Sequence, residues 1–251
     1  QCQIARKDFN SAQRVLARLQ ADFPKDEDVL YQTSKLHMRA WNESIQALYK
    51  NAPASYRVNQ LSAEVFETQA RFGEAIAEYR KAIAKNPVAL NLHFRLGRAL
   101  LLSSHEPAVL AEAQKEFEAE LALNPGDAAA EYEVGTILQA RQKGADAVPH
   151  FERAAALWGD FPEALVALGK IRAEAKQFPQ AIELLERAVK IAPAMESARY
   201  SLMMAYRNAG RVEDAKKQAA EIERLRKPAD GEFSDFLRKL GEKPAASPEK
   251  P

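Results

Sequence analysis

The chain has 251 residues, with 36 lysines and arginines against 35 aspartates and glutamates, a formal charge of +1, and 47% hydrophobic residues. This composition is typical of a folded protein, and the near-zero charge argues against strong binding to nucleic acid or acidic membranes, which needs many uncompensated basic side chains. Its single cysteine, Cys2, excludes an intrachain disulfide framework and a zinc site built from several thiolates, and no apolar run approaches the roughly 20 residues that span a bilayer.

A short pattern recurs along the chain with a period close to 34 residues. Segments 72–87, 145–160 and 178–193 align without gaps, and each carries a small residue, a large residue four positions later and a small one three positions after that. The first small residue recurs in order at Ala12, Ala75, Ala113, Ala147, Ala181 and Ala215, with Trp41 in its place between the first two. A period of this length indicates a tandem array of supersecondary units.

Two helices fit into each period. The spacing i, i+4, i+7 places the recurring residues on one face of a helix, and a second pattern of large and small residues precedes it, as LGRAL (96–100), VGTIL (134–138) and LGKIR (168–172). Helix breakers follow the second helices, because proline lacks an amide donor and disfavours helical geometry in the residue before it. These breakers are Pro24, Pro53, Pro87, Pro125, Pro193 and Pro228, with Gly159 replacing proline once.

The pattern resembles the tetratricopeptide repeat, a helix–turn–helix unit of about 34 residues. The small eighth position of that family is filled by Ser34, Ala63, Gly97, Gly135, Gly169 and Met203, and the large twenty-fourth position by Leu16, Ile45, Tyr79, Phe117, Phe151, Leu185 and Ala219. The resemblance implies an all-α fold, a right-handed superhelical α-solenoid of tandem hairpins over residues 1–228.

The predicted units follow one another in chain order. They are a partial repeat at 1–24, a short degenerate repeat at 27–53, and repeats at 56–87, 90–125, 128–159, 162–193 and 196–227. We expect the two helices of 27–53 to be shortened or partly fused, and the four extra residues of 90–125 to lengthen its inter-helix loop around Ser103 to Pro107.

Residues 229–241 predict a short amphipathic helix that caps the last repeat, with a docking motif for another protein as the alternative, and residues 242–251 predict a disordered tail. At the other end, the first repeat begins in the middle of a helix. We therefore expect the chain to be a fragment of a longer array or fusion, with Cys2 as a small buried hydrophobic residue.

Motifs for catalysis are absent. The four histidines form no metal-binding pair, and the sequence contains no glycine-rich phosphate loop and no nucleophile elbow. The resemblance places His37 and His93 at ring positions of the repeat, which implies packed side chains. We predict that the chain is not an enzyme and binds no cofactor or metal.

The resemblance implies a binding wall made by the second, fifth, ninth and twelfth residues of each first helix, on the concave face of the solenoid. The predicted contact residues are Arg57, Gln60, Glu64, Phe94, Arg98, Leu101, Tyr132, Thr136, Gln139, Val166, Lys170, Tyr200, Met204 and Arg207. The degenerate repeat adds Tyr31, Lys35 and Met38. Rings offer rigid apolar area on this wall, and basic side chains offer directed donors.

We therefore predict a protein–protein interaction scaffold that binds a peptide or a partner protein along its concave face. The alternative is a non-catalytic arm of a larger enzyme or envelope assembly. The charge of +1 disfavours a helical-repeat RNA reader, and the ninth positions lack the asparagine of the chaperone-binding carboxylate clamp. Resemblance to long bacterial repeat proteins favours the periplasm or envelope slightly over the cytoplasm.

Overall fold

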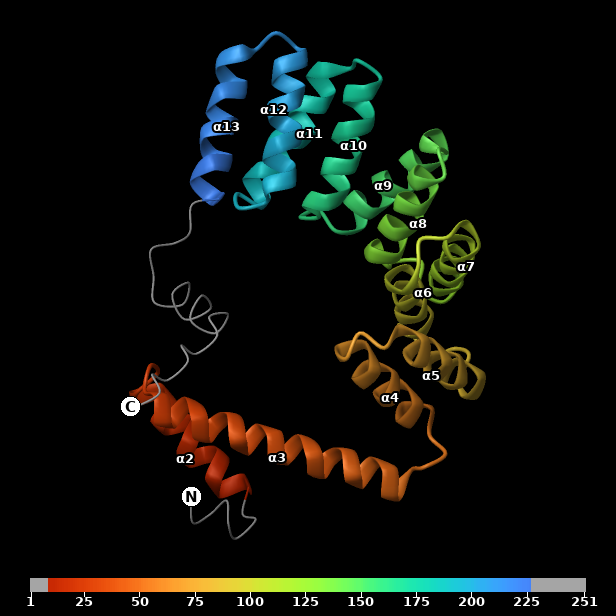
Figure 1. The fold of residues 1–251 in the computed structure, drawn as a ribbon, viewed down its shortest axis with the longest axis vertical. Helices are drawn as coiled ribbons and strands as arrows, with labels where there is room; N and C mark the ends of the chain where they lie inside the picture. The colour runs from red at the N-terminus through yellow and green to blue at the C-terminus, as the bar shows by residue number, and fades with distance from the viewer. Residues whose placement is uncertain (1–8, 227–251) are drawn as a thin grey trace, which may run out of the picture. The chain divides into compact units, whose positions relative to one another are not determined.

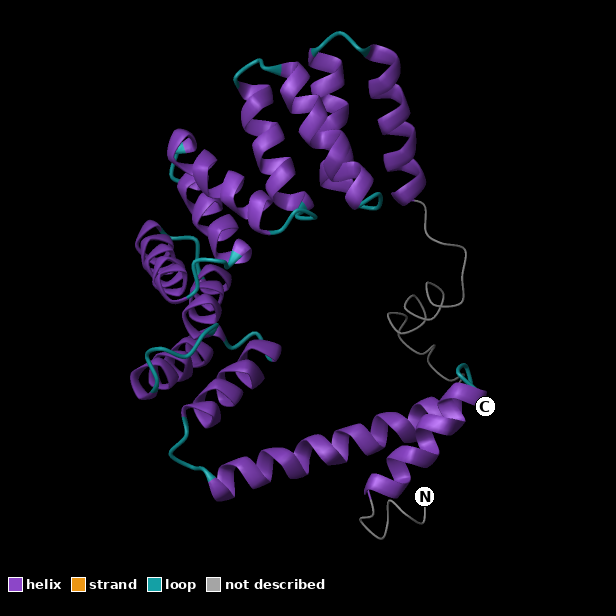
Figure 2. Cartoon of the chain, turned by 180° about the vertical axis from the view of Figure 1, so that it is seen from behind, coloured by secondary structure: helices purple, strands orange, loops and turns teal. Residues whose placement is uncertain are grey.

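The computed structural model describes residues 9–226, and all twelve regular elements in this range are α-helices (Figure 1). Figure 2 shows that short loops join them. The chain divides into two compact units, Gln1–Val109 and Leu110–Pro251. The predicted position of Cys2, the capping helix at 229–241 and the tail at 242–251 lie outside the described residues.

Unit 1 contains five helices. They are α2 (Phe9–Asp22), α3 (Glu27–Asn51), α4 (Tyr56–Thr68), α5 (Phe72–Lys85) and α6 (Leu92–Ser103). Within this unit α2 packs on α3, α4 on α5, and α5 on α6.

Unit 2 contains the remaining helices, of which the first begins at the boundary between the units. They are α7 (Pro107–Leu123), α8 (Ala128–Ala140), α9 (Gly144–Leu157), α10 (Pro162–Glu174), α11 (Phe178–Ile191), α12 (Glu196–Asn208) and α13 (Val212–Arg226). From α8 onward each helix packs on the next one in the chain, and α10 also packs on α12. This arrangement of successive hairpins confirms the predicted all-α solenoid.

The recurring sequence pattern forms the core of the hairpins. In α5, α7, α9 and α11 the anchor alanine and the large residue four positions later are all fully buried; these residues are Ala75, Tyr79, Ala113, Phe117, Ala147, Phe151, Ala181 and Leu185. On the facing helices, a Cβ added to Gly135 would lie 2.8 Å from Phe151 Cε1, and one added to Gly169 would lie 2.6 Å from Leu185 Cγ. Glycine at these two positions lets the paired helices approach closely.

Four hairpins share one turn geometry. Each turn has three residues, and the middle residue has a positive φ: Ala70 (55°), Gln142 (61°), Lys176 (60°) and Gly210 (77°). In each turn the amide of the third residue donates to a carbonyl five positions back, as from Gln177 N to Arg172 O at 2.8 Å. This left-handed middle residue reverses the chain and starts the second helix of the pair.

Residues 27–53 do not form a helix pair. They form the single 25-residue helix α3, so the two expected helices are fused completely rather than shortened or partly fused. The stretch from Glu27 to Asn51 contains neither glycine nor proline. Leu36 stands five residues before Trp41, where other repeats place the left-handed turn residue, and its side chain is buried instead. Without glycine or proline to interrupt it, the helix continues.

The extra residues of the fourth repeat also lie elsewhere than predicted. The turn between α6 and α7 is Ser104–Glu106, three residues long as in the other hairpins. The additional residues lengthen α7, which has 17 residues where α5 has 14, and the linker before α6. Proline is favoured in the first helical turn, so Pro107 starts the helix rather than extending the loop.

Candidate binding surface

Two adjoining cavities lie along the first helices of unit 2. The larger, of about 350 Å³, is lined by Lys170, Ala173, Glu174, Leu185, Tyr200, Ser201, Met204, Ala205 and Asn208. The smaller, of about 150 Å³, is lined by Tyr132, Thr136, Gln139, Glu163, Val166, Ala167, Lys170, Met195 and Ser197. Because Lys170 lines both, we treat them as one surface and name it the unit 2 groove.

Most of the wall residues predicted in unit 2 meet in this groove. Tyr132, Thr136, Gln139, Val166, Lys170, Tyr200 and Met204 all line it. Arg207 is exposed on α12 but does not line either cavity. The second, fifth, ninth and twelfth positions therefore converge along α8, α10 and α12.

The groove combines an apolar floor with polar groups at its edge. Leu185, Val166 and Ala205 are buried beneath it, whereas Lys170 and Glu174 are exposed. Within residues 9–226, no carboxylate lies within ion-pair distance of the Lys170 ammonium group. Lys170 is thus available to an anionic group of a ligand, while the floor suits an apolar side chain.

The two tyrosines of the groove have different environments. The Tyr132 ring centroid lies 5.7 Å from that of Phe151 and 5.1 Å from that of Phe161, so this ring belongs to the packed floor. Burial raises the pKa of Tyr132. Tyr200 is 53% exposed. Of these two rings, Tyr200 is the one that can be buried by a ligand.

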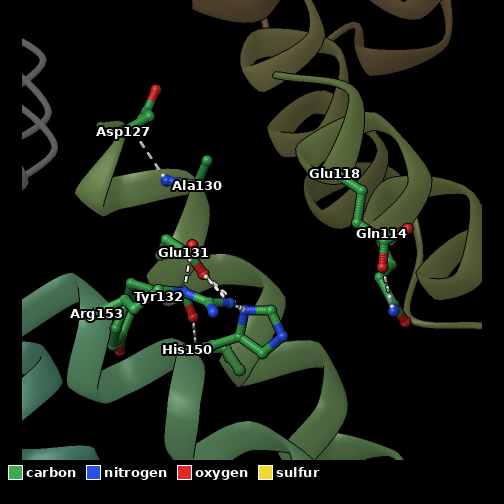
Figure 3. A network of polar contacts seen from close by, with 9 residues as sticks. Gln114, Glu118, Asp127, Ala130, Glu131, Tyr132, His150 and Arg153 are labelled. Carbon is green, nitrogen blue, oxygen red and sulfur yellow. Dashed lines mark hydrogen bonds and ion pairs between the residues drawn. The ribbon is translucent and has the colours of Figure 1, made fainter. Parts of the chain in front are cut away.

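A polar cluster lies next to Tyr132 in the sequence and connects its helix, α8, to α9. Its neighbour Glu131 is 5% exposed and accepts hydrogen bonds from α9: Arg153 Nε lies 2.7 Å from its Oε1, and His150 Nδ1 lies 2.6 Å from its Oε2 (Figure 3). Arg153 Nη2 also lies 3.0 Å from His150 Nδ1, so the three side chains form one cluster. The cluster joins α8 to α9 and so holds the helix that carries Tyr132.

In unit 1 the predicted wall residues bond to one another. Arg57 Nη1 donates to Gln60 Oε1 at 2.8 Å, and Gln60 Nε2 donates to Glu64 Oε1 at 3.0 Å. Arg95 lies beside the same carboxylate, with its Nε atom 3.8 Å from Glu64 Oε1. We name Arg57, Gln60 and Glu64 the α4 ladder. In the α4 ladder the three side chains therefore hydrogen-bond to one another along the same helix.

The other residues predicted in unit 1 do not gather at a described cavity. Phe94 and Leu101 on α6 are half-buried, and Arg98 is exposed. On α3, Tyr31, Lys35 and Met38 are exposed, and so is His37. The expectation that His37 is a packed ring is wrong, because no second helix of a pair covers α3 at this point.

The sequence pattern missed several groove residues. Glu174 and Asn208 are the last residues of α10 and α12, the thirteenth position of their helices, and Met195 precedes α12. These residues lie one position beyond the predicted set or in the linker. The signal that could have found them is their equal spacing, since Glu174 and Asn208 are 34 residues apart.

Two further features are absent from residues 9–226. No three histidine, cysteine, aspartate or glutamate side chains there are grouped so as to hold a metal ion. In the same range, no helix has both the length and the apolar character needed to cross a bilayer.

Comparison with known families gives two matching models, both described as tetratricopeptide repeat. One matches residues 61–104 and 132–196, and the other matches residues 172–240. Together these segments cover more than half of the chain. No curated protein sequence matches the chain.

Solved structures of similar fold share little sequence with this chain. The pilF protein of Pseudomonas aeruginosa has a TM-score of 0.65 at 15% identity and covers 92% of this chain and 99% of its own. MamA 41-end from Desulfovibrio magneticus RS-1 has a TM-score of 0.61 at 18% identity, covering 70% of this chain and 97% of its own. YrrB, described as a TPR protein with an unusual peptide-binding site, has a TM-score of 0.57 at 18% identity. The match covers 78% of this chain and 98% of YrrB.

Proposed function

Because the chain belongs to the tetratricopeptide repeat family, we propose that it is a non-catalytic protein-interaction scaffold that binds a peptide, or a short segment of a partner protein, in the unit 2 groove. The observation that carries this proposal is the convergence of three first helices on two cavities that share Lys170. YrrB, a protein of similar fold, is described as having a peptide-binding site, which supports the same kind of ligand.

The groove favours a ligand with both apolar and acidic groups. Its larger cavity would bury an apolar side chain against Leu185, Ala173 and Met204, and the ring of Tyr200 would cover it. The ammonium group of Lys170 would bind a carboxylate placed next to that side chain. Glu163 and Glu174 at the groove disfavour a ligand with many negative charges, so one acidic group is the expected number.

Two observations support a role without catalysis. The sequence has no nucleophile, phosphate-loop or metal-binding motif. In the described residues, the titratable side chains that line the groove are one lysine, two glutamates and two tyrosines, with no histidine or cysteine among them.

The test is a selection of peptides from a random phage-displayed library on the immobilised chain, followed by fluorescence anisotropy with the selected peptides. We expect peptides that pair an apolar side chain with a carboxylate. Lys170→Glu combined with Tyr200→Ala should weaken their binding by about 10-fold or more, because it removes a cation and an exposed ring from the contact.

The matched control is Lys190→Glu, which reverses an exposed charge on α11 outside the groove. It should leave binding unchanged, and circular dichroism should be the same for all variants. Selected peptides that bind the doubly substituted groove as tightly as the original chain would place the binding site elsewhere.

A further inference from the structure

The last described helix brings the chain back to the unit 2 groove. Arg226 ends α13, and its Nε atom donates to Glu196 Oε1 of α12 at 2.9 Å. Glu196 lies between Met195 and Ser197 in the sequence, and both of these residues line the smaller cavity. The segment that follows Arg226 therefore starts beside one end of the groove.

This segment has the two kinds of side chain that the groove favours. Residues 229–241 carry four apolar side chains at helical spacing, which are Phe233, Phe236, Leu237 and Leu240. A carboxylate directly precedes each of the two phenylalanines, at Glu232 and Asp235. An apolar side chain next to an acidic group is the ligand already proposed for the unit 2 groove.

The outer face of α13 offers these apolar side chains less to cover than α11 offers to α12. In the preceding hairpin, Ile182 and Val189 of α11 pack in the cluster that includes α12. The same two positions of α13, one repeat later, hold Lys216 and Glu223, and both are exposed. A helix that packed on α13 as α12 packs on α11 would place its apolar face against these charges. The segment is thus poorly suited to cap the last repeat.

The segment is long enough to reach all of the groove. On α12 the groove extends from Ser197 to Asn208, which is about 16 Å at 1.5 Å per residue. Phe236 stands ten residues beyond Arg226, and an extended chain of ten residues spans about 33 Å. A segment that enters beside Ser197 can therefore place Phe236 at the larger cavity.

The order of charges along the groove matches that of the segment. Helices α10 and α12 run in the same direction, since residues near their starts line the smaller cavity and their last residues line the larger one. From its start, α10 presents Lys170 and, one turn later, Glu174. The segment presents Asp235 and, three residues later, Arg238. Entering at the start of α12, it would bring its carboxylate to Lys170 and its guanidinium to Glu174, so that both pairs attract. The earlier carboxylates of the segment have no second cation among the described groove residues and would face solvent, away from Glu163.

We propose that residues 229–241 bind in the unit 2 groove of their own chain and compete there with outside ligands. Phe236 enters the larger cavity, and Asp235 binds the ammonium group of Lys170. This inference rests on the proposed function, because it gives the groove a ligand of the same chemistry. An outside peptide then has to displace the segment before it binds.

The test of position is disulfide cross-linking in full chains whose native cysteine is replaced, Cys2→Ser. Ala173→Cys lies in the larger cavity, so together with Leu237→Cys it should form a disulfide within one chain under mild oxidation. The control pairs Leu237→Cys with Lys216→Cys on the outer face of α13, and it should react about 10-fold more slowly because the bound segment is held away from that face. Non-reducing electrophoresis separates a disulfide within one chain from one between two chains.

The test of competition is fluorescence anisotropy with the peptides selected on the groove. Phe236→Ser in the full chain should strengthen their binding by about 10-fold, because a tethered segment competes at an effective concentration of about 1 mM. The matched control is Ala245→Ser, which lies in the chain beyond the segment and should leave binding unchanged. Circular dichroism should be the same for all of these chains.

Three results would overturn the proposal. They are faster cross-linking to Lys216→Cys than to Ala173→Cys, a disulfide that forms only between chains, and peptide binding that Phe236→Ser leaves unaltered. If that last result is found with peptides that still require Lys170, the proposed function stands without this inference. If no peptide is selected and the Ala173→Cys pair still cross-links within one chain, the segment binds the groove and the proposed function fails instead.

Discussion

Helices α4 of unit 1 and α10 of unit 2 are both the first helix of a hairpin, and both have 13 residues. The side chains at their predicted wall positions nevertheless have different surroundings. The second, fifth and ninth positions of α4 form the α4 ladder, in which each side chain bonds to the next. The same positions of α10 are Glu163, Val166 and Lys170, which line the unit 2 groove.

The difference follows from how each helix is surrounded. Among the described helices, α4 packs extensively only on α5, and its buried residues are Val58 and Ala63. α10 packs on α9, α11 and α12, and it has six consecutive buried residues from Ala164 to Gly169. A first helix enclosed by neighbours forms cavities with apolar floors, whereas an open one satisfies its polar groups locally.

The largest expected effect tests the close packing of α10. Gly169→Leu should lower the free energy of unfolding by about 3 kcal/mol, because even a Cβ at this position would lie 2.6 Å from Leu185 Cγ and the paired helices would have to separate. Urea denaturation followed by circular dichroism measures the change. In α4 the same eighth position holds Ala63, so that hairpin already accommodates a methyl group.

The matched control is Gly73→Leu in α5, where an added Cβ would have no atom within 4 Å. This substitution should change stability by no more than about 0.5 kcal/mol. Equal stability of the Gly169→Leu and Gly73→Leu chains would mean that α10 and α11 are not in close contact at this glycine.

A smaller effect on stability is expected from the ionisation of a buried tyrosine, of which each unit contains one. Tyr206 Oη donates to Glu186 Oε1 at 2.5 Å in unit 2, and Tyr79 Oη donates to Glu67 Oε2 at 2.9 Å in unit 1. Burial, followed by the adjacent carboxylate, raises the pKa of Tyr206 to about 12, and the same two causes raise that of Tyr79. Both folded-state environments favour the neutral phenol.

This shift predicts a loss of stability in alkali. The unfolded chain releases the Tyr206 proton near pH 10, whereas the folded chain retains it until about pH 12. The unfolded state therefore binds fewer protons between these values, and stability falls as the pH rises. By pH 11 Tyr206 should contribute about 1 kcal/mol of this loss.

The measurement is urea denaturation of the original chain and of Tyr206→Phe at pH 9 and pH 11. Phenylalanine keeps the ring and removes the titrating group, so the stability difference between the two chains should decrease by about 1 kcal/mol over this range. A difference independent of pH would show that the phenol titrates alike in both states.

The sequence predicted the hairpins of unit 2 well because their contacts are local and repeat. A fully buried alanine and a large residue four positions later recur in α9 and α11, and the glycines of α8 and α10 face them. Such spacing determines which faces meet, and seven of the wall residues that the sequence predicts line the unit 2 groove. The sequence could not predict the role of Tyr132, because the contact of its ring with Phe161 depends on the angle between successive hairpins.

The errors lie where the repeat is irregular. Trp41 replaces the anchor alanine, and the stretch from Glu27 to Asn51 has neither glycine nor proline, so the two expected helices are fused into α3. The repeat length predicts that Pro107 lies in a loop, whereas it starts α7, since proline is also favoured at the first position of a helix. In both cases the hydrophobic pattern alone was ambiguous, and local turn chemistry decided the structure.

The smallest expected effect tests that turn chemistry. Lys176 has a φ of 60°, a left-handed conformation that costs a residue with a side chain about 1 to 2 kcal/mol. Lys176→Gly should therefore raise the free energy of unfolding by about 0.5 to 1 kcal/mol, the remainder being offset by the greater freedom of glycine in the unfolded chain. Ala70→Gly in unit 1 should act in the same direction, since its φ is 55°.

The reverse substitution is available at Gly210, where φ is 77° and an added Cβ would meet no atom within 4 Å. Gly210→Ala should therefore destabilise the fold by about 1 kcal/mol through backbone strain alone. Thermal unfolding compares the three chains with the original, and destabilisation by Lys176→Gly would mean that the Lys176 side chain, rather than the backbone, stabilises this turn.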